Sequence, residues 1–291
     1  MSTFIQYVLS GISIGAIYSL IGLGFYIMWS ACRAVNFAHG DVVMVGAVVA
    51  VVCLDAGISQ AVGLPLAVVA CVGYGMLVER FAVRPFNKDA SAIGWMLTTI
   101  AIGIMVESFA TIKFGSFARA LPSPGVAKPI NIFGAGVYLQ ELLIPAFAIV
   151  FMIGLEVFYR RTMLGRAMRA IAFNRVAAGL MGINVSRVTG ISFGLAAGLG
   201  GFAGILVGPI IQVSTTMGVL IGLKGFAVAI MASVTSARGV VITGLLYGVM
   251  EKFVEGYISS AAREIVGFSI MILILLMFPQ GIFGRREVTK V

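Results

Sequence analysis

Long runs of residues without a charged side chain dominate this chain of 291 residues. An α-helix needs about 20 apolar residues to cross the hydrocarbon core of a bilayer. The runs also lack the two-residue alternation that is typical of membrane β-barrel strands. The pattern therefore predicts an all-α polytopic membrane protein. The longest runs are Met1–Cys32, Ala56–Val78, Val188–Leu223 and Ile265–Gly284, of 32, 23, 36 and 20 residues.

We expect eight or nine transmembrane helices in a single domain over residues 1–291. Two segments are short, because Asp41 and Lys224 leave each of them only 13 uncharged residues in a row, about 20 Å of helix. Each either extends past its charge or is a broken or re-entrant helix, which is tolerated where protein or water covers the freed backbone. The expected segments are 4–30, 38–56, 60–79, 92–112, 140–159, 188–211, 219–236, 239–257 and 264–284.

Composition excludes several classes of protein. Only 11% of the residues are charged, against roughly 25% in soluble domains, and the mean hydropathy is +1.09. No Lys follows a Gly, so the phosphate-binding P-loop pattern is absent. The chain has one His, and its three Cys lack metal-ligand spacing. We therefore expect a protein that is not an enzyme and that binds no cofactor or metal, with any ATP bound by partner subunits.

The distribution of Lys and Arg predicts the orientation. If the loop after residue 160 is cytoplasmic and all nine segments cross, 14 of the 20 cations face the cytoplasm, four face outside and two lie within spans. The N-terminus is then outside and the C-terminus inside. The net charge of +9 reflects this topology, and we expect no nucleic acid partner. The four outside are Lys113, Arg119, Lys128 and Arg263, and the first three either meet a charged partner or only keep the loop soluble.

Two loops are long. The predicted outer loop, residues 113–140, contains Pro122, Pro124 and Pro129 and is expected to be irregular. The predicted cytoplasmic loop, residues 160–187, has helix-compatible composition through Ala178, and Gly182 would allow a turn after it. A short helix there is either a docking element for a partner groove or a plain interfacial helix.

A polar stretch, Arg33–Asp41, lies between two apolar runs. Polar groups at membrane depth are costly and mark functional candidates. Asn36 and His39 are candidates for hydrogen bonds across helices, and Asp41 for capping the next helix. The alternative is a structural cap that only turns the chain.

The remaining charged residues within spans are few. Glu107 would serve proton-coupled transport, or it pairs with Lys113 or Lys252. Glu251 and Glu255 share a helical face and are expected to form a solvated rim.

Glycines four residues apart predict close helix packing. They either pack helices within this chain or form a seam with another subunit. The pairs and triplet are Gly11 with Gly15, Gly194 with Gly198, Gly244 with Gly248, and Gly200 with Gly204 and Gly208.

Several motifs resemble the permease subunits of branched-chain amino acid ABC importers. The first joins Gly15-Ala-Ile-Tyr-Ser-Leu20 with Asn36-Phe-Ala-His-Gly-Asp41. The second is Ala177-Ala178 followed by Met181-Gly-Ile-Asn-Val185, and the third is the ending Phe278-Pro-Gln-Gly-Ile-Phe-Gly284. The resemblance covers essentially the whole chain and is to the shorter of the two permease types in these importers.

The resemblance implies a bacterial inner-membrane subunit that works with a second, longer permease, two ATPase subunits and a periplasmic solute-binding protein. It implies coupling to the ATPase through Ala177, Ala178 and Gly182, with Arg169 and Asn174 nearby. It implies a pathway or gating role for Asn36, Phe37, His39, Gly40 and Asp41. Val176 stands where many importers have Glu, so that contact would be apolar.

The solute stays open at this point. The resemblance implies branched-chain or other hydrophobic amino acids, while relatives carry urea, short amides or aromatic acids. A different class is a secondary transporter driven by an ion gradient, with Glu107, His39 or Asp41 as a relay. An intramembrane enzyme would have only His39 and Asp41 for its chemistry.

Overall fold

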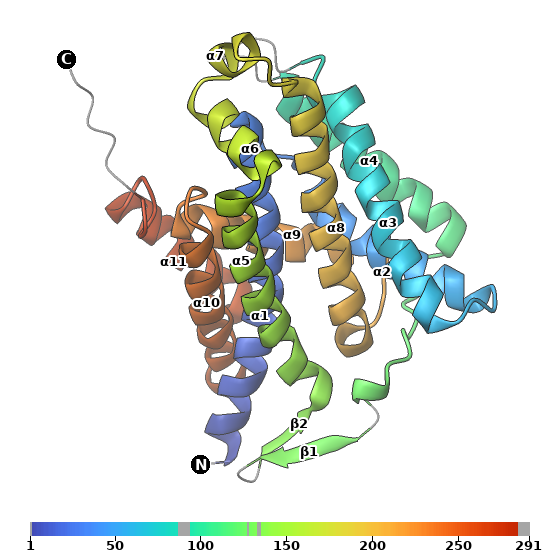
Figure 1. Ribbon diagram of the computed structural model, residues 1–291. Coiled ribbons are helices and arrows are strands. Elements are labelled where there is room, and N and C mark those ends of the chain that lie inside the picture. The colour runs from blue at the N-terminus through green and yellow to red at the C-terminus, as the bar shows by residue number, and fades with distance from the viewer. Residues whose placement is uncertain (1, 87–93, 127, 133–134, 285–291) are drawn as a thin grey trace.

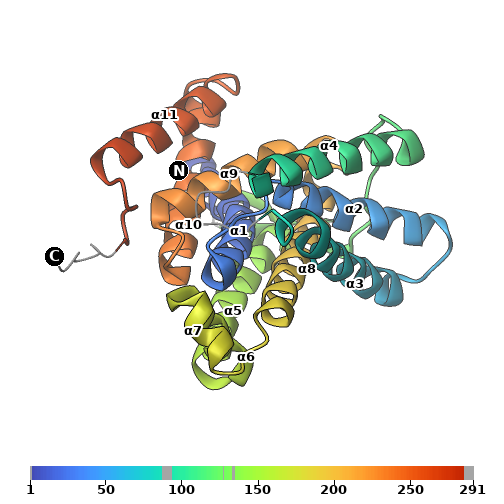
Figure 2. The same ribbon diagram turned by 90° about the horizontal axis from the view of Figure 1, so that it is seen from above.

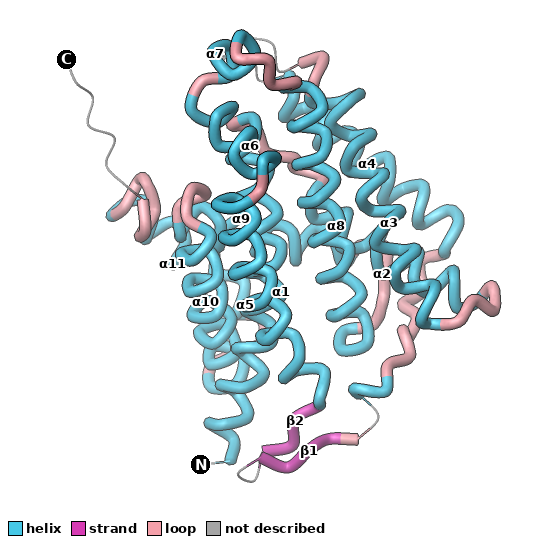
Figure 3. The backbone as a smooth tube through the Cα atoms, in the orientation of Figure 1, coloured by secondary structure: helices cyan, strands magenta, loops and turns pink. Residues whose placement is uncertain are grey.

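The computed structural model describes residues 2–86, 94–126, 128–132 and 135–284, which form a helical bundle with one small β-hairpin (Figures 1 and 3). Each of the nine expected segments contains a helix, and residues 92 and 93 of the fourth lie outside the described ranges. Two of the predicted segments were too long, because α9 ends at Ala232 instead of residue 236 and α11 ends at Met277 instead of residue 284. The helices are α1 Ser2–Cys32, α2 His39–Asp55, α3 Gln60–Val78, α4 Gly94–Phe114, α5 Leu139–Arg161, α6 Met163–Phe173, α7 Arg175–Leu180, α8 Val185–Ile211, α9 Met217–Ala232, α10 Ala237–Tyr257 and α11 Ala262–Met277, with a π-helical turn at Glu79–Val83 and a 3-10 turn at Pro124–Val126.

The bundle has two ends (Figure 1). We call the end with α6 and α7 the basic end, and the end with the start of α1 and strands β1 (Pro129–Ile132) and β2 (Ala135–Tyr138) the hairpin end. Side-chain contacts show that α10 runs opposite to α1 and α5 between these ends. Arg238, at the start of α10, pairs with Glu156 near the end of α5, while Tyr257 at the other end of α10 packs on Tyr7.

Within the described ranges, five helical segments have the length and composition to cross a membrane: Thr3–Cys32, Gln60–Val83, Gly94–Phe114, Leu139–Arg161 and Val185–Ile211. The two segments expected to be short are short, with 17 residues in α2 and 16 in α9. Both begin where other helices cover them, since their first turns pack on each other through Gly40 and Gly218. This burial is what allows a helix to start inside a bundle without exposing its backbone to lipid.

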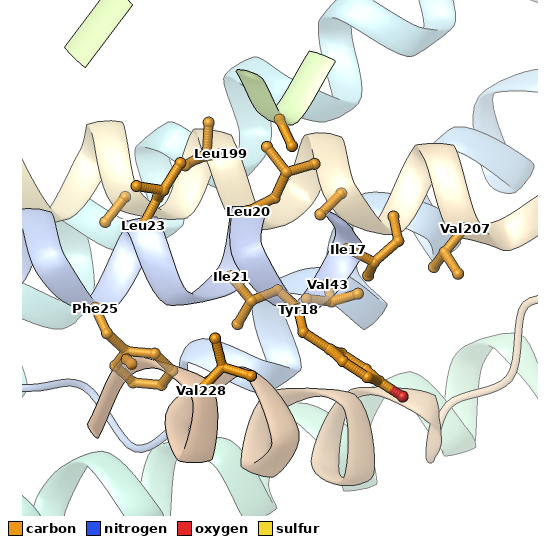
Figure 4. Packing of buried hydrophobic residues seen from close by; sticks show 14 of the residues in the cluster. Ile17, Tyr18, Leu20, Ile21, Leu23, Phe25, Val43, Leu199, Val207 and Val228 are labelled. Carbon is orange, nitrogen blue, oxygen red and sulfur yellow. The ribbon is translucent and has the colours of Figure 1, made fainter. Parts of the chain in front are cut away.

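Helix α1 is the centre of the core. Seen from above, it lies between α11 on one flank and α2–α4 on the other (Figure 2). From Gly15 to Met28 its side chains are buried on nearly all sides, in agreement with the lack of a polar face there. Leu20 and Leu23 point toward Leu199 of α8, whereas Ile21 and Phe25 point toward Val228 of α9 (Figure 4).

The glycines allow helix backbones to touch. A Cβ atom added at Gly15 would lie 2.4 Å from the carbonyl oxygen of Gly244, and one at Gly11 2.6 Å from the Cα atom of Val249. A Cβ at Gly204 of α8 would lie 1.9 Å from the carbonyl oxygen of Val43 in α2. These glycines therefore serve helix packing within this chain, which was one of the two predicted roles.

The prediction of an irregular loop at residues 113–140 was wrong in part, because Pro129–Ile132 and Ala135–Tyr138 pair as antiparallel strands. Ile130 pairs with Val137, whose side chain is buried. Pro129, which has no backbone N–H to donate, is compatible with this because it is the first residue of its strand and the sheet has only two strands in the described chain. Residues 127, 133 and 134 of this loop lie outside the described ranges.

The second long loop was expected to be helical through Ala178, and it is helical but broken at Asn174. This residue has extended backbone, ends α6 and begins α7. Its side chain accepts hydrogen bonds from the N–H groups of Val176 and Ala177, both at 3.0 Å. Asn is among the best N-cap residues, so the break follows from the local sequence.

Candidate functional site

The α6–α7 segment protrudes at the basic end (Figure 1). Ala178 anchors α7, because it is 4% exposed and packs in a small apolar cluster with Met168 and Val188. Gly182 follows α7 with a φ of +84° and has no atom within 4 Å of an added Cβ. Only glycine adopts this conformation freely, so the turn after α7 depends on it.

The outer face of α7 is apolar and uncovered. Val176, Leu180 and Met181 are 74%, 85% and 84% exposed. Phe173, at the end of α6, is also exposed. A contiguous patch of this kind on a projecting element is typical of a protein contact site.

Of the five residues assigned to coupling, four lie together and one does not. Asn174, Ala177, Ala178 and Gly182 all belong to α7 and its two boundaries. Arg169 instead lines a separate cavity of about 460 Å³ together with Tyr26, Arg33 and Gln280.

The Asn36–Asp41 stretch forms the entry into α2. Contrary to the prediction, the side chains of Asn36 and His39 make no hydrogen bond across helices within the described residues; instead the backbone N–H of Phe37 donates to the Thr99 hydroxyl of α4 at 3.3 Å. The Asn36 side chain accepts a local hydrogen bond from the N–H of Ala38 at 3.0 Å. His39 is 1% exposed, and neither ring nitrogen makes a hydrogen bond within the described residues. The ring packs edge-on against Phe25, with centroids 4.9 Å apart, and lies between Gly24 and Gly200.

Asp41 does not cap α2, because it is the third residue of that helix and no side chain caps its start. Its carboxylate is turned toward α4, where an added Cβ at Gly103 would lie 2.4 Å from Oδ2. Asp41 is 7% exposed. It lines a cavity of about 270 Å³ with Phe37, Gly40 and Glu107, so the structure brings three of the predicted pathway residues together with Glu107.

Glu107 was expected either to serve proton-coupled transport, or to snorkel to the interface or pair with Lys113 or Lys252. The ion-pair alternative is wrong for the described part of the chain. Lys252 pairs with Glu255 at 3.0 Å. Glu107 is half-buried on α4, one helical turn beyond Gly103, and therefore on the face that Asp41 approaches.

A second, larger group of charged side chains was not predicted from the sequence. Lys224 of α9 and Glu251 of α10 are 3% and 2% exposed, and the Lys224 ammonium donates to the Glu251 carboxylate. Lys224 also donates to Glu264 at 2.8 Å, and the Tyr18 hydroxyl donates to Glu251 at 2.6 Å. The expectation that Glu251 belongs to a solvated rim was therefore wrong.

These groups line a cavity of about 550 Å³ between α1, α8, α9, α10 and α11. Arg263 completes the network through Glu255 at 3.1 Å and Glu264 at 3.0 Å. The sequence held a signal for it, since a Lys within an apolar run needs a partner and Glu251 lies in the next span.

Two charged sites of different character result. In the larger cavity the cations and carboxylates of the network pair with each other, although Glu264 Oε2 has no hydrogen-bond partner among the described residues. In the smaller cavity, Asp41 and Glu107 form no ion pair with any described residue. No group of three or more His, Cys, Asp or Glu suited to a metal ion occurs in the described ranges.

Comparisons with known proteins agree along the whole chain. Residues 7–276 match the family model described as branched-chain amino acid transport system / permease component. The chain is 32% identical to the high-affinity branched-chain amino acid transport system permease protein LivH of Escherichia coli, over 99% of this chain and 98% of that protein. It is 30% identical to BraD of Pseudomonas aeruginosa, a permease protein of the same description, with the same coverage.

One solved structure is similar in fold. It is PsaBC from Streptococcus pneumoniae in complex with Fab, with a TM-score of 0.50 over 94% of this chain and 91% of that one. The sequence identity is 13%, so the likeness concerns the arrangement of helices only.

Proposed function

Since this chain belongs to the family of branched-chain amino acid transport permease components, a family of membrane transport subunits rather than enzymes, we propose that it is a membrane-spanning subunit of an ATP-driven importer for branched-chain or other hydrophobic amino acids. The observation that carries this proposal is the match to transport permeases over 99% of the chain. In the proposed importer, this chain forms the translocation path with a second, longer permease, two ATPase subunits bind and hydrolyse ATP, and a periplasmic binding protein delivers the solute.

In this proposal the basic end faces the cytoplasm and the hairpin end faces outside. The excess of Lys and Arg in the loops of the basic end supports this orientation. The orientation places the N-terminus outside. It also places the exposed residues Lys113, in the last turn of α4, and Lys128, in the following loop, where a solute-binding protein would dock.

The α7 segment is the proposed contact with the ATPase. Three properties support it: α7 protrudes, Asn174 and Gly182 fix its two ends, and Val176, Leu180 and Met181 expose an apolar face. A short helix whose apolar side fills a groove transmits a displacement efficiently, because packed interfaces are not continuously deformable. ATP shifts the permeases between inward- and outward-facing states only if it binds one of them better than the other.

The experiment that tests this function is ATP-dependent uptake by the importer reconstituted with its partner subunits, comparing Gly182→Glu with Gly57→Glu. Both glycines have positive φ, +84° and +80°, and open space around an added Cβ. Gly57 follows α2, away from α7. The backbone cost of the substitution, about 1–2 kcal/mol, is therefore matched, and we expect only Gly182→Glu to abolish uptake while both variants insert normally. Unchanged uptake by Gly182→Glu would refute the role of α7.

A second candidate function is a transporter driven by an ion gradient. One observation favours it: Asp41 and Glu107 lie on one cavity without a cationic partner in the described chain. In that case uptake survives ATP depletion and collapses with an uncoupler. The importer requires the opposite result.

A further inference from the structure

We propose that the cavity between α2, α4 and α9 is a binding site for a solute that joins an ammonium group to an apolar side chain. This inference rests on the proposed function, because hydrophobic amino acids belong to that chemical class. It assigns the recognition of the amino group to Asp41 and Glu107, and the recognition of the side chain to the aromatic wall of the same cavity.

The carboxylates supply the charge that an ammonium needs. Asp41 is more than nine-tenths buried, lines the cavity and has no hydrogen-bond or ion-pair partner among the described residues. A buried carboxylate without a partner costs several kcal/mol. The protein keeps that cost in the absence of solute, and a bound ammonium relieves it through a charge-assisted hydrogen bond.

The rest of the cavity lining is mainly apolar and aromatic. Phe25, Phe37 and Phe226 contribute rings, with centroids of Phe25 and Phe37 at 5.2 and 5.4 Å from that of Phe226. Phenylalanine faces attract cations as well as aliphatic groups. The volume of about 270 Å³ is slightly below the range of about 300–1,000 Å³ for ligand pockets, which suits a solute as small as an amino acid.

The first turn of α2 adds a third element. Gly40 and Asp41 belong to this turn, and the first N–H groups of a helix have no partner within it. A helix N-terminus favours an anion, so the carboxylate of an amino acid would lie toward this turn. This helix start supports a solute site only together with the two side-chain carboxylates and the aromatic rings.

The larger cavity is a weaker candidate for the same solute. There, Lys224 and Arg263 already neutralise Glu251 and Glu264, so a solute ammonium would have to displace a cation of the protein. A metal ion is also a poor match for the smaller cavity. The described chain offers it two carboxylates and an aromatic wall, without a third ligand from His, Cys, Asp or Glu.

The position of the cavity fits a site on a transport path. Seen from above, α4 and α9 lie along one edge of the molecule (Figure 2). Around the cavity they expose Ile104 and Leu223 at 61% and 45%. In the proposed importer the second permease would cover this edge, so that the cavity would lie between the two permeases.

The first test is a labelling experiment on the complete reconstituted importer. Ile104→Cys places a thiol on the cavity wall, and the unmodified chain, with Cys53 and Cys71 buried and Cys32 half-buried, gives the background. We expect L-leucine and isoamylamine to slow the reaction of Cys at position 104 with a maleimide at least about threefold. Isocaproate has the same apolar group without the amine, and it should not protect. Equal protection by isocaproate would overturn the assignment of the ammonium.

The second test uses Asp41→Asn and Glu107→Gln in the same assay and in uptake. We expect each variant to lose the protection by isoamylamine and to raise the KM for leucine uptake about tenfold, as for the loss of one charge-assisted hydrogen bond. Asp55→Asn is the control, since Asp55 is exposed and pairs only with Arg119 among the described residues. Asp55→Asn should keep the protection by isoamylamine and the KM for leucine uptake of the unmodified importer.

The outcomes separate this inference from the proposed function. If the unmodified importer takes up leucine with ATP and Asp41→Asn leaves protection and KM unchanged, the site is wrong and the function stands. If isoamylamine protects through Asp41 but no hydrophobic amino acid is taken up with ATP, the proposed function is wrong and the amine site stands.

Discussion

The Lys224–Glu251 ion pair offers the sharpest prediction on stability. Both side chains are at most 4% exposed, and they join α9 to α10 within the bundle. Lys224→Met keeps the length and most of the packing of the side chain while it removes the charge. Glu251 then remains buried, with the Tyr18 hydroxyl at 2.6 Å and the Arg263 guanidinium at 3.6 Å.

The expected loss of stability depends on the charges that remain near Glu251 in the variant. Removing one partner of a buried ion pair costs about 3–5 kcal/mol, because the other charge is left uncompensated. Arg263 still neutralises part of the charge on Glu251, so we expect a loss of about 3 kcal/mol. In the double variant Lys224→Met with Glu251→Gln, no charge of the pair is left. Its loss should be at least about 1.5 kcal/mol smaller than the sum of the two single losses.

Thermal unfolding in mild detergent measures both quantities. At about 2–4 °C per kcal/mol, Lys224→Met should lower the melting temperature by about 6 °C or more. Lys252→Met is the matched control, because the Lys252–Glu255 pair is 25% and 29% exposed and such pairs contribute at most about 1 kcal/mol. Equal shifts for the two Lys variants, or additive losses in the double variant, would refute this reasoning.

Two further predictions concern packing and capping. Gly204→Ala should destabilise the protein by about 3 kcal/mol or more, because the added Cβ meets the carbonyl oxygen of Val43 at 1.9 Å. Gly73→Ala is the control and should not destabilise the protein, because its added Cβ meets nothing within 4 Å. Thermal melting curves of the two variants test this difference. Asn174→Ala should speed hydrogen exchange of the two N–H groups that its side chain caps by roughly 2- to 30-fold, for a lost cap worth about 0.5–2 kcal/mol. Asn184→Ala, which removes the cap of α8, should leave those two N–H groups unchanged, and equal acceleration in both variants would contradict the assignment.

The sequence predicted the membrane class and the presence of nine apolar helices, because apolar runs of this length are compatible with few structures other than helices in a membrane. It also indicated that the segments at Asp41 and Lys224 are short, since each charge interrupts an apolar run. Two residues of α7, Ala177 and Ala178, were identified through a resemblance rather than through local chemistry. The hairpin was missed because its paired strands have four residues each, too few for a clear alternation.

The charged network was missed for a different reason. Glu251 lies near the end of a span, where a solvated carboxylate is the ordinary case. Its burial depends on α9 and α1 packing over it, with Lys224 and Tyr18 as partners. Such a partnership is a property of the tertiary arrangement, and no spacing along the chain encodes it. The same holds for Asp41, whose direction is set by the missing side chain at Gly103.

The close contact of α1 with α10 has a consequence for how the protein is made. The Ser19 hydroxyl of α1 donates a hydrogen bond to the carbonyl of Val241, 222 residues later in the chain. During synthesis, α1 therefore enters the bilayer long before the glycine surface that it fits has been translated. Until α10 is inserted, the glycines of α1 face lipid or the proteins that insert the chain into the membrane. Helix α1 is thus made long before α10 and reaches its final neighbours late, and a chain truncated before α10 would leave the α10-facing glycines of α1 without their partner.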